Sequence, residues 1–79
     1  MYTVRVYLKN LDDGREFVRL AEGFTGDVDL TEGNISIDGK SIIGAGMLPY
    51  PCKMNAVLHD DSESTKSLFH LVMERFVGE

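Results

Sequence analysis

Apolar and polar residues alternate over the first eight positions of the chain, which is the pattern of a β-strand with one buried face. The apolar members are Tyr2, Val4, Val6 and Leu8. Two further segments repeat this alternation on either side of a Glu32-Gly33-Asn34 turn, so we expect a β-hairpin there. Its apolar members are Val28, Leu30, Ile35 and Ile37. Residues 54–59 form a fourth predicted strand.

Three other segments have helical spacing. Asp13 and Glu16 are spaced as in a capping box and precede an apolar stripe, which predicts a helix over residues 13–22. Ser41 precedes an Ile-Ile pair as an N-cap precedes a short helix, which two prolines then end. The final helix has apolar residues at i, i+3, i+4 and i+7, namely Phe69, Val72, Met73 and Phe76.

The element order is therefore β-α-β-β-α-β-α within a single domain, residues 1–79. One sheet with all its helices on one face buries these apolar stripes most economically. The predicted fold class is α+β, an open-faced β-sandwich with a four-stranded antiparallel sheet and three helices on one face.

Composition narrows the classes of partner. The formal net charge is −5, which disfavours nucleic acid and anionic membranes because both require a basic surface. Cys52 is the one cysteine, so no internal disulfide can form. We expect Cys52 to be a packed or surface thiol. The N-terminus does not have the pattern of a signal peptide, and no apolar run is long enough to span a membrane. We therefore expect a cytoplasmic protein.

Two segments resemble the HPr family of phosphocarriers from the bacterial sugar phosphotransferase system. Phe17-Val18-Arg19-Leu20-Ala21-Glu22-Gly23-Phe24 is similar to the FVKEAKGF-like first helix of that family, and Gly39-Lys40-Ser41-Ile42-Ile43-Gly44 resembles its KSIMG-like segment. The resemblance is collinear over essentially the whole chain. It implies the same fold, no cofactor, no enzymatic activity, and protein partners of the phosphotransferase or catabolite-regulation type.

The family's phosphoryl-carrying segment, His-x-Arg-Pro, is not retained. On this resemblance Asn10 takes the place of the histidine, and Asp12 and Asp13 take the places of the arginine and proline. An imidazole can accept and release a phosphoryl group, whereas a carboxamide cannot, and two carboxylates would repel phosphate. The other histidines, His59 and His70, are expected far from this position.

Ser41 corresponds in the resemblance to the family's regulatory serine, the target of an ATP-dependent kinase. Ile42, Ile43 and Met47 would form an apolar patch for a protein partner beside it. Simpler interpretations remain open. Ser41 can serve as a helix cap alone, and Met47 with Leu48 can fill the core under the short helix.

No other motif predicts chemistry. The acidic groups at residues 12–16 and 60–63 suit helix starts better than a metal site, and the second group lacks the spacing of an EF-hand. Three hypotheses follow. The first is an HPr-like regulatory or interaction module phosphorylated at Ser41, the second is a phosphocarrier that uses another residue, and the third is an unrelated small binding domain on the same fold.

Overall fold

A computed structural model of the protein describes residues 1–78. The strands are β1 (Tyr2–Leu8), β2 (Asp27–Glu32), β3 (Ile35–Asp38) and β4 (Cys52–His59). The helices are α1 (Leu11–Ala21), α2 (Ile42–Gly46) and α3 (Glu63–Met73), and a 3-10 turn η1 (Glu74–Phe76) follows α3. The predicted order β-α-β-β-α-β-α is confirmed.

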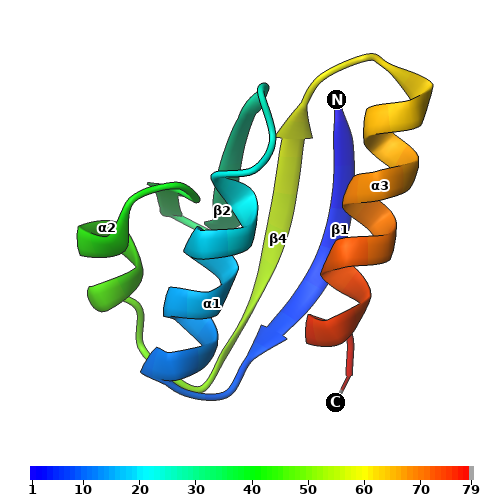
Figure 1. Ribbon diagram of the computed structural model, residues 1–79. Coiled ribbons are helices and arrows are strands. Elements are labelled where there is room, and N and C mark those ends of the chain that lie inside the picture. Colours follow the sequence, from blue (N-terminus) through cyan, green and yellow to red (C-terminus); the bar gives the residue numbers. More distant parts are fainter. Residues whose placement is uncertain (79) are drawn as a thin grey trace.

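The four strands form one antiparallel sheet in the order β1-β4-β2-β3. The helices lie on one face of this sheet, with α1 and α3 side by side across it and α2 beside α1 at the β3 edge (Figure 1). Among residues 1–78, no helix covers the other face. The predicted open-faced sandwich is therefore confirmed.

The β2–β3 hairpin closes through a two-residue loop, because Glu32 pairs with Ile35. Gly33 has a φ of +56°, a left-handed conformation that glycine adopts without steric cost. A positive φ at the first loop position alone is the pattern of a type II′ turn, which matches the twist of the flanking strands.

The core lies between the sheet and the helices. β1, β2 and β4 each direct alternate residues inward, as the sequence predicted for β1 and β2. Above them, one aromatic pair joins the segment after α1 to α3, and another joins α1 to η1. The ring centroids of Phe24 and Phe69 are 5.3 Å apart in an edge-on arrangement, and those of Phe17 and Phe76 are 5.7 Å apart. Phe17 and Phe69 are fully buried. These contacts help to hold α1 and α3 over the sheet.

Several boundaries differ from the sequence prediction. α1 begins at Leu11, two residues before the expected start, and ends at Ala21, one residue before the expected end. β4 begins at Cys52 rather than at Met54, and Phe76, expected on the final helix, lies in η1. The first difference has a clear cause. Asn10, not Asp13, caps the helix, because the Asn10 carboxamide oxygen accepts from the backbone N–H of Asp13 at 3.0 Å. Asp13 therefore occupies the third helical position, where its charge suits the helix N-terminus.

Candidate functional site

The start of α1 is the place where the resemblance predicts a phosphoryl-carrying residue. Asn10 has extended backbone geometry and its side-chain oxygen is used as the helix cap. The Asp13 carboxylate in turn accepts from the backbone N–H of Lys9 at 2.9 Å, and Lys9 Nζ lies 3.6 Å from the same carboxylate. Two backbone N–H groups near this helix start, those of Lys9 and Asp13, are thus satisfied by side chains of the chain itself.

This arrangement has a chemical consequence. The carboxamide of Asn10 is not a nucleophile that can carry a phosphoryl group. Asp12 and Asp13 add negative charge in the first turn of the helix, and that charge opposes an incoming phosphate. The residue types at this helix start therefore differ in chemistry from a nucleophilic phosphate carrier.

Ser41 lies at the N-cap of α2, as expected. Its Oγ accepts from the backbone N–H of Gly44 at 3.1 Å. The loop that leads to Ser41 is held by its own hydrogen bonds, since Asp38 accepts from the backbone N–H groups of Lys40 and Ser41. Lys40 Nζ also donates to the carbonyl of Phe24 at 2.5 Å. Ser41 is half-buried.

Three large apolar side chains of the α2 region point into solvent. The exposed fractions are 52% for Ile42, 76% for Ile43 and 79% for Met47. We call these three residues the α2 surface. The neighbouring Ala45 and Leu48 are buried instead. The interpretation that Met47 and Leu48 fill the core is therefore correct for Leu48 and wrong for Met47.

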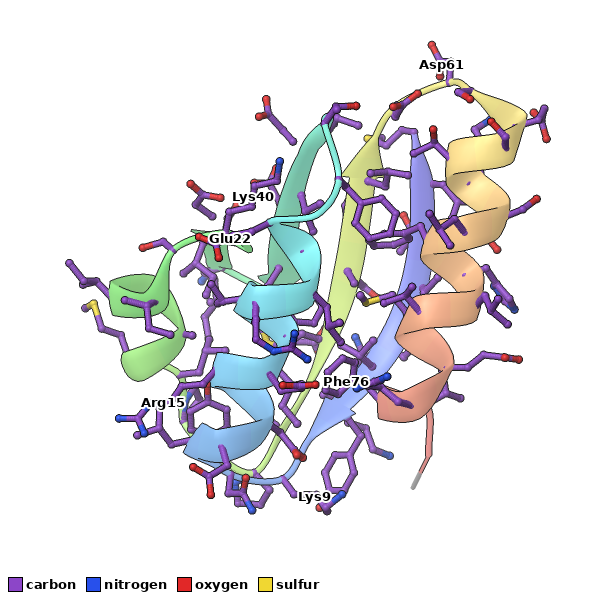
Figure 2. All side chains as sticks on the ribbon, viewed as in Figure 1. Lys9, Arg15, Glu22, Lys40, Asp61 and Phe76 are labelled. Atoms are coloured by element: carbon purple, nitrogen blue, oxygen red, sulfur yellow. The ribbon has the colours of Figure 1, made fainter. Side chains whose placement is uncertain are left out.

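The start of α1 and Ser41 lie toward opposite ends of the α1–α2 pair. Lys40 contacts the chain just after α1, at Phe24. Tyr50, which follows α2, contacts Gly14 in the first turns of α1. Arg15 extends from α1 on the side that faces α2 (Figure 2). Among residues 1–78, Arg15 makes no ion pair.

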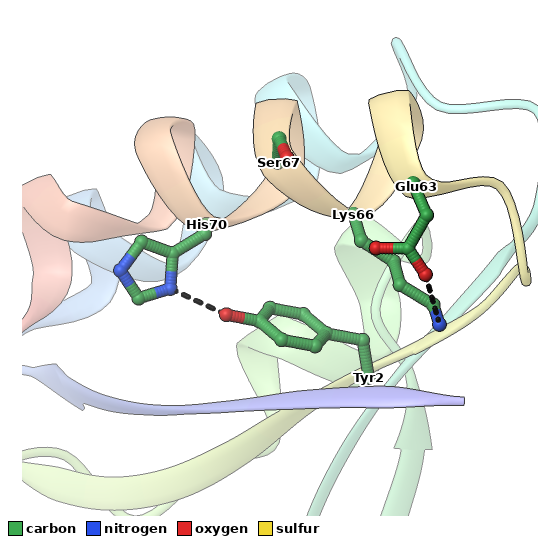
Figure 3. Close-up of a pocket in the computed structure, with 5 residues that line it drawn as sticks. All are labelled: Tyr2, Glu63, Lys66, Ser67 and His70. Atoms are coloured by element: carbon green, nitrogen blue, oxygen red, sulfur yellow. Dashed lines mark hydrogen bonds and ion pairs between the residues drawn. The ribbon is translucent and has the colours of Figure 1, made fainter.

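Both histidines lie away from Asn10. His59 ends β4 opposite Asp27, at the end of the sheet remote from the β1–α1 junction, and its Nε2 is 2.8 Å from a carboxylate oxygen of Asp29. His70 lies on α3, where its Nδ1 is 2.6 Å from the hydroxyl of Tyr2 (Figure 3). That pair lines a shallow pocket of about 480 Å³ between α3 and β1, together with Glu63, Lys66 and Ser67.

Cys52 is half-buried at the start of β4, and this burial raises the pKa of its thiol. A raised pKa leaves less of the reactive thiolate at neutral pH. Within residues 1–78, no three His, Cys, Asp or Glu side chains are placed so that they could hold a metal ion. No helix in the described part of the chain is long and apolar enough to cross a membrane.

Sequence reasoning missed the contact that joins α1 to α2. The Tyr50 hydroxyl donates to the carbonyl of Ala45 at 2.6 Å, and the ring lies against Gly14. Gly14 inside a helix was the one available signal, because glycine is a poor helix former that often marks a close approach. The sequence offered no means of choosing Tyr50 as the approaching group.

The chain was also compared with known proteins. No protein-family model and no curated protein matches it. Among solved structures, it is similar to HPr-C-His from Thermoanaerobacter tengcongensis, with a TM-score of 0.71 and 22% sequence identity. The match covers 94% of this chain and 92% of that chain. At this identity the likeness concerns the fold, and the HPr-like fold expected from the sequence is confirmed.

Proposed function

We propose that this protein is a non-enzymatic HPr-like interaction module of the phosphotransferase or catabolite-regulation type, and that phosphorylation of Ser41 regulates it. The α2 surface is the docking surface, and Ser41 at the start of α2 is the switch. No phosphoryl group is carried at the start of α1.

The observation that carries this proposal is the exposure of the α2 surface directly after Ser41. Two large apolar side chains on a helix of five residues, and a third on the residue that caps it, leave an unusually apolar surface for so small an element. Exposed apolar groups of this kind are typical of protein-binding sites. A phosphate on Ser41 adds charge and strong acceptors at the edge of that surface, and such a change can create or abolish a contact.

The hydrogen bonding of Asn10 supports the proposal that no phosphoryl group is carried at the start of α1. Its side chain is committed to capping α1, and two carboxylates follow it. The HPr-like fold is that of a phosphocarrier, but the residue types at this helix start do not suit phosphoryl transfer. A role through binding is therefore favoured over a role through carriage.

The test is intact-mass measurement after incubation with an HPr kinase and ATP. We expect one phosphate adduct on the wild-type chain and none on Ser41→Ala. Ser67→Ala is the matched control, because Ser67 is an exposed serine on α3, and this variant should gain the adduct. If the wild-type chain gains no adduct, the proposal that phosphorylation of Ser41 regulates the protein is refuted.

A second incubation separates the competing hypothesis. With phosphoenolpyruvate and the first enzyme of the phosphotransferase system, we expect no acid-labile phosphate on the chain. Acid-labile label at His59 or His70 would instead support a phosphocarrier that uses another residue.

A further inference from the structure

Tyr50 connects the end of α2 to the beginning of α1. Its hydroxyl donates a hydrogen bond of 2.6 Å to the carbonyl of Ala45, inside α2. Its backbone N–H donates to the carbonyl of Leu48 at 3.0 Å, which folds the chain back after the helix. The ring is half-buried and packs against the core. The side chain thus contacts α2 with its polar end and the core with its body.

The contact with α1 requires glycine. A Cβ atom added at Gly14 would lie 1.8 Å from the Tyr50 hydroxyl oxygen and 2.8 Å from Cζ. Both distances are far below any van der Waals contact, so no other residue fits at position 14 while Tyr50 stays in place. Glycine weakens a helix interior. The stability that α1 loses by having glycine at position 14 is consistent with a gain in stability from the close packing of Tyr50.

α2 depends on such tertiary contacts. It has five residues, of which Gly44 and Gly46 are poor helix formers. A helix this short is not stable by itself in water. Its inward anchors are the buried side chains of Ala45 and Leu48, and its ends are held by the Ser41 cap and by the Tyr50 hydroxyl.

We propose that Tyr50 is a positioning residue, a clasp that fixes α2 on α1 and presents the α2 surface in one orientation. The importance of this orientation rests on the proposed docking function, whereas the clasp itself can be measured without it. Burial is the main reason that the pKa of Tyr50 is raised, so the phenol keeps the proton that it donates to Ala45. A preformed surface avoids the cost of ordering α2 when a partner binds.

The first experiment is residue-resolved amide hydrogen exchange on the full chain. Tyr50→Phe keeps the ring and removes the hydrogen bond. We expect exchange of the Ala45, Met47 and Leu48 amides to become about threefold to tenfold faster, because that is what the net contribution of one hydrogen bond allows. The amide of Ala56 in β4 should change less than these.

Tyr7→Phe is the matched control. Tyr7 lies on β1, and its hydroxyl has no hydrogen-bond partner in residues 1–78. It should leave exchange in α2 unchanged. The proposal would be wrong if the α2 amides exchange in Tyr50→Phe at the same rate as in the wild type. It would also be wrong if Tyr7→Phe accelerates their exchange by the same factor as Tyr50→Phe.

A second pair of variants tests the contact with α1. Gly14→Ala should lower the melting temperature of the wild-type chain, because its methyl group displaces Tyr50. In a Tyr50→Ala background the same substitution should raise the melting temperature, because alanine is the better helix former. The same sign of change in both backgrounds would show that Gly14 does not serve Tyr50.

The third readout tests positioning rather than stability. With an HPr kinase and ATP, we expect Tyr50→Phe to raise the KM for the protein and to leave kcat unchanged, because only the presentation of α2 is altered. An unchanged or lower KM would refute the positioning role. If neither the wild-type chain nor Tyr50→Phe is phosphorylated, the proposed function is wrong. Hydrogen exchange then still decides whether Tyr50 fixes α2 on α1.

Discussion

Arg5 on β1 forms a bidentate ion pair with Glu32 on β2, and its side chain crosses the open face of the sheet above β4. Arg5 Nη1 lies 2.6 Å from one Glu32 oxygen and Nη2 lies 3.0 Å from the other. Asn55 of β4, which is directly opposite Arg5 in the register, accepts a further hydrogen bond from Nη1 at 3.2 Å. One guanidinium thus links three neighbouring strands on the face that no helix covers.

This pair predicts how stability responds to acid. The hydrogen bonds from Arg5 lower the pKa of Glu32 below its ordinary value of 4.5. The folded state therefore holds this proton less tightly than the unfolded state, and the stabilisation is present above pH 4.5 and is lost as the pH falls through the folded pKa. When the melting temperature is measured at a series of pH values, Glu32→Gln should lose less stability on acidification than the wild type does.

The control for this comparison is Glu74→Gln. Glu74 is exposed and forms no ion pair within residues 1–78, so its curve should follow the wild type. Parallel curves for Glu32→Gln and the wild type would contradict the prediction. Because both partners are exposed to water, we also expect the difference to shrink at high salt.

Tyr50 predicts a response at the alkaline end. Burial, and then the neighbouring Cys52 and Asp13, raise its pKa above the ordinary value of 10.0. The folded phenol therefore keeps its proton longer than the unfolded one, and this stabilisation is complete below pH 10 and is lost as the pH rises through the folded pKa. Tyrosinate absorbance in the near ultraviolet should show a late-titrating component that Tyr50→Phe removes and Tyr7→Phe retains.

The cap of α1 gives a prediction on stability alone. Asn10→Ala removes the oxygen that satisfies the Asp13 N–H and should cost about 1 kcal/mol of unfolding free energy in urea titrations. Asn10→Ser supplies a similar acceptor and should cost only a few tenths of that value. Equal losses for the two variants would mean that the side chain has another role at this position.

The α2 surface gives a prediction on recognition. Ile43→Ser and Met47→Ser should each lower kcat/KM for phosphorylation of Ser41 about fivefold or more, as removal of a central interface residue commonly does. Their unfolding free energies should change by less than about 0.5 kcal/mol, because both side chains are exposed. Leu71→Ser on α3, which is 65% exposed, is the matched control and should leave both quantities unchanged.

Neighbouring residues of α3 allow a sharp test of the core. Phe69 is fully buried against Tyr2 and Phe24, whereas Leu68 is 53% exposed. Phe69→Ala should cost about 3–5 kcal/mol, enough to unfold much of so small a domain. Leu68→Ala should cost less than about 0.5 kcal/mol. Circular dichroism during urea titration measures both, and similar losses would contradict the assigned faces of α3.

The sequence alone determined the element order and the buried faces of β1 and β2, whereas Ile35 and Ile37 of β3, expected on a buried face, are not buried. It could do so because these features depend on local periodicity, with a period of two in strands and of 3.6 in helices. The helix start at Asn10 was less accessible, because Asn10 and Asp13 both have the chemistry of a cap. Only the backbone geometry shows that Asn10 provides the cap and that Asp13 donates its N–H to it.

The candidate functional site could likewise be predicted from the sequence only in part. Residue types were sufficient to place Ser41 at a helix cap. They could not tell that Met47 is exposed while Leu48 is buried, nor that Tyr50 reaches Gly14. Those facts depend on how α2 lies against α1, which is decided by contacts between residues 36 positions apart. Side-chain periodicity carries no information over such a separation, because the path of the chain through the sheet, and not local geometry, brings the two residues together.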